Sequence, residues 1–211
     1  MTILIIVATV LISISAFPPE IGSIDAVRKK DLFHKFKFNA YMVFHRKEWW
    51  RLFSSGLIHA DWMHLIFNML TLYFFGGTVE LYFKYNFGTW GIPMFILLYV
   101  AALAVSSIPD LIKHKNNHYY NAVGASGAVS AILFAAILFD PTMKIMLFII
   151  PIPIPGYVFA PLYLLYSHYM SNKNMDNIGH NAHFWGAVFG FFFPVLFNFS
   201  LLSSFVFKIL Q

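Results

Sequence analysis

GASGAVSAILFAAILF, residues 124–139, begins with small residues and continues as an almost entirely apolar run. A run without charged residues is typical of a helix inside a membrane or at the centre of a protein. It carries a serine, Ser126, close to its start. The hydroxyl of Ser126 is therefore a candidate nucleophile in apolar surroundings, provided that other parts of the chain supply a base and hydrogen-bond donors.

The composition places the whole chain in the same apolar class. Of its 211 residues, 59% are hydrophobic and 11% are charged, whereas about a quarter are charged in an ordinary soluble domain. The mean hydropathy is +0.69. Six long apolar stretches occur, each near the roughly 20 residues that a helix needs to cross a bilayer: 2–17, 57–83, 90–108, 123–139, 157–169 and 178–199. The sequence predicts an all-α, polytopic membrane protein with six transmembrane helices in one domain, residues 1–211.

The first apolar stretch is expected to be an anchor rather than a cleaved signal peptide, because no basic leader precedes it and no small-residue cleavage site follows. The next segment, 18–56, mixes basic with aromatic residues. That mixture suits a segment that lies in the headgroup interface. Nucleic-acid binding uses similar residues, but the flanking apolar stretches hold this segment at the bilayer. With no cysteine in the chain, a disulfide framework, a thiol nucleophile and a thiolate metal site are excluded.

Polar side chains gather near the beginnings of the second, fourth and sixth stretches, within 57–83, 123–139 and 178–199. In a chain that crosses a membrane six times, these three helices begin on the same side. The polar residues there are His59, His64, Asn68, Ser126, His180 and His183. Because His64 and Asn68 are four residues apart, both project from one helical face. We expect the hydroxyl, the imidazoles and the amide to lie at one depth.

Glycines near these polar residues would allow the close helix contact that catalysis needs. A serine is activated only when a base lies within about 2.6–3.2 Å of its oxygen, and helices at the usual spacing of about 8–10 Å make that contact difficult. Gly124 and Gly127 flank Ser126, while Gly186 and Gly190 follow His183 by three and seven residues, on nearly its face. Taken alone, Ser126 also fits a small-residue packing patch, and each histidine fits an internally hydrogen-bonded packing role.

Together the motifs resemble those of the rhomboid intramembrane serine proteases, over most of the chain from Trp50 onward. The matching motifs are Trp50-Arg51, His59-x4-His64-x3-Asn68, Gly76-Gly77-x2-Glu80, Gly124-x-Ser126-Gly127 and Ala182-His183-x2-Gly186-x3-Gly190. The resemblance implies a six-helix rhomboid core with the active site in 57–199. It also implies a Ser126–His183 dyad without a carboxylate, and the sequence agrees, since no acidic residue lies in the middle of a predicted stretch.

The resemblance assigns further roles within the chain. The oxyanion is expected to be stabilised by His64, Asn68 and the backbone N–H of Ser126. Structural support is expected from Gly124, Gly127, Gly186, Gly190, His59, Trp50, Arg51 and Glu80. The fifth helix and the loop 171–179 would act as gate and cap.

The resemblance also implies the partners and the location. The substrates would be single-span transmembrane proteins, cleaved in the lipid bilayer without a cofactor, a metal or a nucleic-acid partner. The expected location is the bacterial inner (plasma) membrane, as a multi-pass protein. The oligomeric state does not follow from the sequence.

Two features depart from the family pattern. Many members carry an aromatic residue one turn after the nucleophile, where it stacks on the catalytic imidazole, and this chain has Ser130 there. In addition, most of the 14 Lys and Arg residues fall in the first, third and fifth loops, which the positive-inside rule would place in the cytoplasm. The family places those loops outside, and we follow the family.

Two classes of protein other than a protease would also share features of this sequence. A catalytically silent rhomboid-like protein that binds membrane helices would share the fold, but such proteins usually lack the dyad. A membrane metalloenzyme could use His59, His64, His180 and His183, because imidazole suits zinc and iron. No carboxylate or thiolate is positioned in the sequence to join those histidines.

Overall fold

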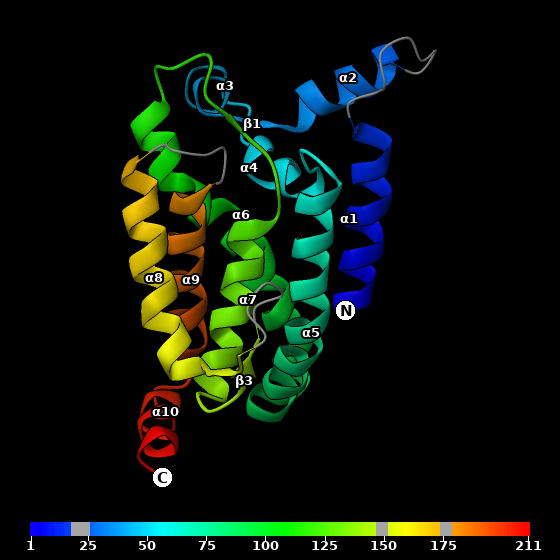
Figure 1. Ribbon diagram of the computed structural model, residues 1–211. Coiled ribbons are helices and arrows are strands. Elements are labelled where there is room, and N and C mark those ends of the chain that lie inside the picture. Colours follow the sequence, from blue (N-terminus) through cyan, green and yellow to red (C-terminus); the bar gives the residue numbers. More distant parts are fainter. Residues whose placement is uncertain (18–25, 147–151, 174–178) are drawn as a thin grey trace.

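The structure is a computed structural model that describes residues 1–17, 26–146, 152–173 and 179–211, and within these ranges the chain is mainly helical (Figure 1). The helices are α1 Thr2–Ala16, α2 Ala26–Phe36, α3 Ala40–Arg46, α4 Arg51–Ser54, η1 Ser55–Leu57, α5 Trp62–Phe87, η2 Gly88–Trp90, α6 Gly91–His114, α7 Ser126–Phe139, α8 Gly156–Lys173, α9 His180–Val195 and α10 Ser200–Leu210. Two antiparallel strand pairs join β1 Phe38–Asn39 to β2 Asn121–Ala122 and β3 Lys144–Ile145 to β4 Ile154–Pro155. Residues 18–25 of the predicted interfacial segment and 174–178 of the predicted cap lie outside the described residues.

Each of the six predicted apolar stretches contains a helix: α1, α5, α6, α7, α8 and α9. Judged by length and composition, one helical stretch of the described residues, Trp62–His114, is long and apolar enough to cross a membrane. The pair α9 and α10 meets the same criterion together but is bent by 108°, and α1 and α7 are apolar but shorter. The helical prediction is confirmed, whereas six separate membrane crossings stay a prediction.

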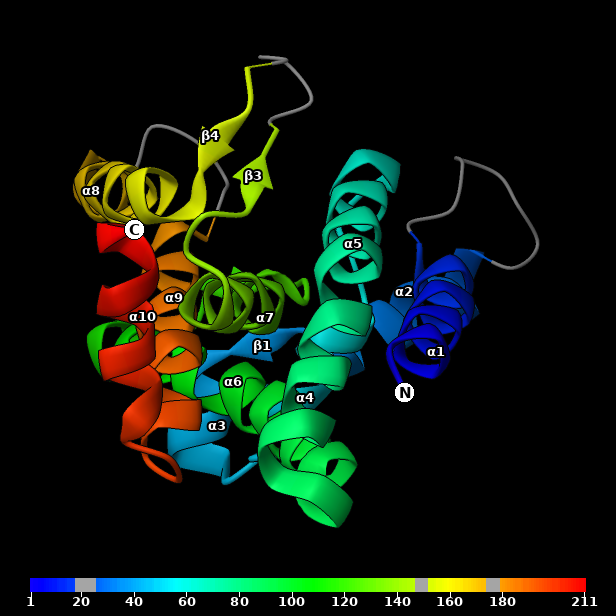
Figure 2. The same cartoon turned by 90° about the horizontal axis from the view of Figure 1, so that it is seen from below.

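Helix α7 occupies the centre of the fold, with α5, α6 and α9 around it (Figure 2). Every residue from Gly127 to Phe139 is buried. A helix that is apolar on all sides can be surrounded by lipid or by protein, and small residues favour packing against other helices. The small residues of α7 therefore suit its central position, and Ser126, its first residue, is only partly buried.

Glycines bring α9 into direct backbone contact with α7. A Cβ added to Gly186 would overlap the carbonyl oxygen of Gly127, and one added to Gly190 would overlap the carbonyl oxygen of Ala131. A Cβ on Gly127 would in turn overlap the hydroxyl of Ser106 in α6. Small residues at a helix interface allow this close approach, and it fixes the first turns of α7 and α9 side by side.

The short elements of the first loop gather at one end of the long helices, as Figure 1 shows for α2, α3, α4 and β1. The pairing of β1 with β2, Phe38 with Ala122 and Asn39 with Asn121, joins this loop to the segment that leads into α7. Arg51 then secures the loop from inside, as described below. The loop is thus a folded element at the end of the bundle where α7 begins.

The sixth predicted stretch, 178–199, extends beyond its helix, and a further helix that was not predicted follows it. Helix α9 ends at Val195 and α10 begins at Ser200. Pro194 lies in the last turn of α9, and the side chain of Asn198 accepts hydrogen bonds from the N–H and the hydroxyl of Ser200. Proline restricts the continuation of a helix, and an asparagine side chain that accepts the N–H two residues on favours a turn. The Nζ of Lys208 in α10 then donates to the carbonyl oxygen of Phe139 at 2.7 Å, at the C-terminal end of α7.

Candidate active site

A cavity of about 1840 Å³ lies where α5, α7 and α9 begin, with α6 and α8 contributing to its walls. The predicted site residues that line it are His64, Asn68, Gly124, Ser126, Gly127 and His183. The structure thus brings together the candidate nucleophile, the candidate base and the candidate oxyanion donors. They come from three helices that are far apart in the sequence.

Ser126 is the first residue of α7, and the turn before it depends on Gly124. Gly124 has φ +113°, a conformation that favours glycine, and its N–H donates to the carbonyl oxygen of Ser55 at 2.9 Å. A Cβ on Gly124 would also overlap the ring of His64. The backbone therefore passes directly over His64 just before it reaches Ser126.

His183 lies in the first turn of α9, where its N–H donates to the carbonyl oxygen of Gly179 at 3.0 Å. Its ring stacks on Tyr163 of α8, with centroids 6.4 Å apart and an interplanar angle of 20°. The ring of His180 meets it edge-on, with centroids 5.9 Å apart. Because Gly186 contacts Gly127, His183 and Ser126 project from adjoining turns of two helices in backbone contact.

His64 and Asn68 are set by the start of α5. The carboxylate of Asp61 accepts the N–H of His64 at 2.8 Å, which is a helix N-cap. The Nδ2 of Asn68, a buried side chain, donates to the carbonyl oxygen of His64 at 2.9 Å. An asparagine amide carries two N–H donors, so Asn68 has a second donor in addition to this bond.

His59 supports the site from behind the cavity wall. It is 1% exposed, and its Nε2 accepts the N–H of Ala125 at 3.4 Å. The ring proton is accordingly assigned to Nδ1, which donates to the hydroxyl oxygen of Ser13 at 2.9 Å, while that hydroxyl donates to the carbonyl oxygen of Leu57. His59 thus ties α1 to the turn that presents Ser126.

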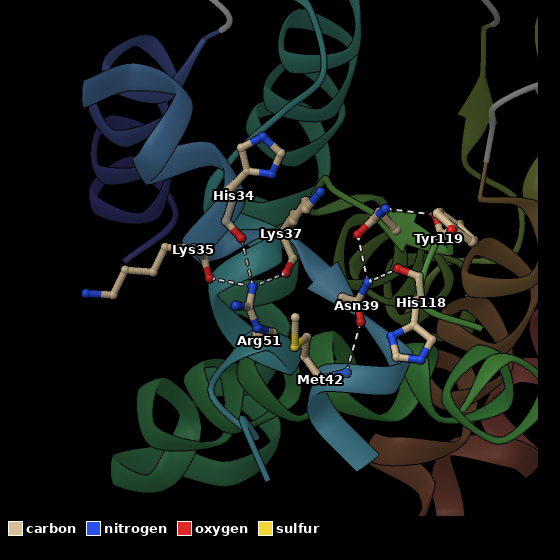
Figure 3. A pocket seen from close by; sticks show the side chains of 9 residues that line it. His34, Lys35, Lys37, Asn39, Met42, Arg51, His118 and Tyr119 are labelled. Atoms are coloured by element: carbon tan, nitrogen blue, oxygen red, sulfur yellow. Dashed lines mark hydrogen bonds between the residues drawn. The ribbon is translucent and has the colours of Figure 1, made fainter. Parts of the chain in front are cut away.

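Arg51 does not line this cavity; it lines a second, smaller pocket, where it organises the first loop (Figure 3). Its Nη1 donates to the carbonyl oxygens of His34, Lys35 and Lys37 at 2.7–3.0 Å, and its Nε pairs with Glu48 at 2.5 Å. Burial, together with the nearby Arg51 charge, lowers the pKa of Lys37. Arg51 therefore holds separate segments of this loop together through buried polar contacts.

Trp50 and Glu80 also lie outside the residues that line the cavity. Trp50 is 49% exposed and immediately precedes α4. An oxygen of Glu80 accepts the N–H of Thr2 at 2.7 Å, and a Cβ on Gly76 would overlap the side chain of Thr2. Gly76 and Glu80 of the Gly76-Gly77-x2-Glu80 motif therefore hold the beginning of α1 against α5.

Three residues of the site region were not predicted from the sequence, Tyr163, Asp110 and Asn181, and Ser130 was noted only as a departure from the family pattern. The hydroxyl oxygens of Ser130 and Tyr163 are 2.7 Å apart. The carboxylate of Asp110, buried at the end of α6, accepts the Nδ2 of Asn181 at 2.6 Å. Tyr163 and Tyr166 are three residues apart, as are His180 and His183. This equal spacing is the sequence signal that could have pointed to the contact of Tyr163 with His183.

Asp110 also interacts with Tyr120 in the segment that leads into α7. Burial, with the charge and hydrogen bond of Asp110, raises the pKa of Tyr120. Asp110 therefore connects the start of α9 to the segment before α7. Within the described residues, no group of three or more His, Asp or Glu side chains is arranged to hold a metal ion.

Comparison with known proteins gives a family match for most of the chain. The model of the Rhomboid domain matches residues 46–199. Rhomboid protease GluP of Bacillus subtilis (strain 168) is 31% identical over 153 residues, which cover 69% of this chain and 25% of that protein. RHOMBOID-like protein 12, mitochondrial, of Arabidopsis thaliana is 30% identical over 154 residues, which cover 64% of this chain and 43% of that protein. The chain spans less than half the length of either relative.

Proposed function

The chain belongs to the rhomboid family, and on this basis we propose that it is an intramembrane serine endopeptidase that cleaves transmembrane segments of other membrane proteins. The nucleophile in this proposal is Ser126 and the base is His183. The family makes the protein an integral membrane protein, and the six-helix rhomboid core is part of the proposal.

The contact between Gly186 and Gly127 is the observation that carries the proposal. A Cβ on Gly186 would overlap the carbonyl oxygen of Gly127, the residue that follows Ser126. His183 is one turn before Gly186, so its side chain leaves α9 beside the start of α7. Both side chains line one cavity. Nucleophilic acyl transfer needs a base within hydrogen-bond reach of the serine oxygen, and side chains on adjoining helical turns can make that approach.

The proposed reaction proceeds through an acyl-enzyme. The Ser126 oxygen attacks the scissile carbonyl carbon while His183 takes the hydroxyl proton, and His183 then gives this proton to the leaving amine as the C–N bond breaks. Water attacks the resulting ester, with His183 again accepting and returning a proton. Ser126 is regenerated and the new carboxyl group leaves.

The negative charge that develops on the carbonyl oxygen needs preorganised donors. The first N–H groups of a helix lack intrahelical partners and lie at the positive end of its dipole, and Ser126 begins α7. The ring of His64 lies against Gly124, and the Asn68 amide lines the same cavity. One such donor is typically worth about 2.7–4 kcal/mol in the transition state.

We propose single-span membrane proteins as the substrates, since only a segment held in the bilayer could present its peptide bond at this depth. The cavity also has polar and charged lining residues, among them Asp110, Lys113 and Asn121, which suit the entry of water. The bacterial inner membrane stays our prediction for the location. One relative is bacterial, and the name of the other places that protein in mitochondria.

The direct test is cleavage of a model transmembrane substrate by detergent-solubilised protein. Ser126→Ala is expected to abolish cleavage and labelling by a fluorophosphonate probe while leaving the thermal unfolding midpoint nearly unchanged. Ser107→Ala is the matched control. Its hydroxyl is bonded to the carbonyl oxygen of Leu103 and its side chain lines the same cavity, so activity should stay within about twofold.

The base is tested with the two histidines of α9. His183→Ala should lose fluorophosphonate labelling of Ser126, whereas His180→Ala should keep most of it. The opposite result would transfer the role of the base to His180. A wild-type protein that binds a substrate helix but neither cleaves it nor becomes labelled would show a catalytically silent member of the family.

A further inference from the structure

The ring of Tyr163 in α8 lies beside the ring of His183, at 6.4 Å between centroids and 20° between planes. We propose that Tyr163 is the positioning residue of the catalytic imidazole, and that Ser130 in turn holds Tyr163. The inference rests on the proposed function, because it concerns the orientation of the base for Ser126. Helix α8 would then orient the base as well as form part of the cavity wall.

Two aromatic pairs join α8 to α9 in a matched register. Tyr163 contacts His183, and Tyr166 contacts His180 edge-on with centroids 5.6 Å apart. Within each helix the two partners are three residues apart, so both lie on one face. The order is reversed between the helices, as expected for antiparallel neighbours. The contact of Tyr163 with His183 is therefore set by the packing of α8 against α9.

The ring of Tyr163 is itself held from several directions. Its hydroxyl oxygen is 2.7 Å from that of Ser130 in α7, and its ring lies against Phe134 of α7 and Phe159 of α8, with centroids 5.4 Å and 5.5 Å away. A side chain with packed neighbours and a hydrogen bond at its tip has little rotational freedom. Tyr163 can therefore transmit its position to the imidazole that stacks on it.

Ser130 lies one helical turn after Ser126, on the same helix as the nucleophile. Its hydrogen bond to Tyr163 connects the helix that carries the nucleophile to the ring that orients the base. The stack at 20° is an offset, near-parallel arrangement, one of the two that aromatic pairs prefer. Rotation of His183 about its side-chain bonds would break this stack, so the contact favours one direction of the imidazole.

The experiment compares three variants at position 163 in the full-length protein, using cleavage kinetics and fluorophosphonate labelling rates. Tyr163→Leu removes the ring and is expected to lower kcat by about 10- to 100-fold, the effect of a misplaced catalytic group, with KM within about twofold. Tyr163→Phe keeps the ring and should retain at least about a third of wild-type kcat. Tyr163→Met replaces Tyr163→Leu if the latter does not fold, since methionine fills irregular space, and the same loss is expected.

The matched control is Tyr166→Leu, which removes the neighbouring ring of α8 that contacts His180, and it should leave kcat within about twofold. A folded Tyr163→Leu with wild-type kcat would overturn the inference. An equal loss in Tyr163→Phe would also overturn it, because the hydroxyl rather than the ring would then matter. An effect confined to KM would make Tyr163 a substrate contact instead.

These outcomes are separable from a failure of the proposed function. If the wild-type protein is inactive and unlabelled, the proposed protease activity fails first. If the wild-type protein depends on Ser126 and His183 but not on Tyr163, only the positioning role fails. Ser130→Ala adds a second check, since loss of the hydrogen bond with the ring retained should cost less than the loss of the ring.

Discussion

Asn68 and Asn86 make the same local contact at opposite ends of α5. Each side-chain Nδ2 donates to the carbonyl oxygen four residues earlier, at 2.9 Å for Asn68 and 2.8 Å for Asn86. Asn68 lines the cavity, whereas Asn86 is not among the residues that line it. At the scale of single residues, comparing these two asparagines distinguishes the effect of losing a hydrogen bond within the helix from the effect of losing a donor in the proposed active site.

Asn68→Ala is expected to lower kcat by about 10- to 1,000-fold with little change in KM, because it removes a donor that acts mainly in the transition state. Asn86→Ala removes the equivalent helix bond and should change kcat by less than about twofold. Cleavage kinetics of both variants on one model substrate check this. An increase in KM alone for Asn68→Ala would show that the amide binds substrate in the ground state.

At the scale of helices, the glycines of α9 decide how closely α9 approaches α7, and with it how closely the proposed base approaches the proposed nucleophile. The Cα of Gly127 would lie 2.9 Å from a Cβ added to Gly186, which is closer than van der Waals contact allows. By contrast, a Cβ added to Gly77 of α5 would meet nothing within 4 Å. Gly77 therefore serves as a control for the general effect of replacing glycine by alanine in a helix.

Gly186→Ala is expected to destabilise the protein by about 1–3 kcal/mol, the usual cost of overpacking, and to lower cleavage about 10- to 100-fold by moving His183 away from Ser126. Gly77→Ala should be neutral or stabilising by about 0.4–1 kcal/mol, because alanine restricts the unfolded chain. Thermal unfolding in detergent and cleavage rates test both. A Gly186→Ala protein with wild-type stability and activity would contradict the close packing of α7 and α9.

At the scale of the whole molecule, the basic residues of the first loop conflict with the orientation that the family implies. The structure gives a physical reason to follow the family. The loop forms α2, α3, α4 and β1, and the charge of Arg51 is taken up by Glu48 and by three carbonyl oxygens of the loop. The positive-inside rule describes short connectors, and longer folded loops follow it less closely.

We predict that the loop between α6 and α7 faces the extracytoplasmic side. Because the chain has no cysteine, Asn117→Cys introduces a single thiol at an exposed position, and it should react with an impermeant maleimide in intact cells. Thr89→Cys, exposed in η2 at the other end of α5 and α6, should react only after lysis. The reverse pattern would invert the topology.

Much of the fold could be predicted from apolar residues alone. The run 124–139 is apolar on every side, which predicts a helix inside a membrane or at the centre of a protein, and α7 is that helix. The end of α9 at Val195 and the additional helix α10 from Ser200 could not be predicted in the same way, because the residues on both sides of the break are still apolar. The turn depends on Pro194 and on the hydrogen bond from the N–H of Ser200 to the side chain of Asn198, which are local signals within an apolar run.

The sequence by itself determined the class of the protein, the positions of its main helices and the residue types available for catalysis, because hydropathy and motif spacing are properties of neighbouring residues. It placed Ser126, His183, His64 and Asn68 as candidates. Only the tertiary structure decided what stacks on His183. Position 130 holds a serine, and the ring comes from Tyr163 on another helix. Contacts between helices depend on their packing register, here set by the glycines of α9 against α7 and by the aromatic pairs of α8 with α9, and no local pattern specifies such a register.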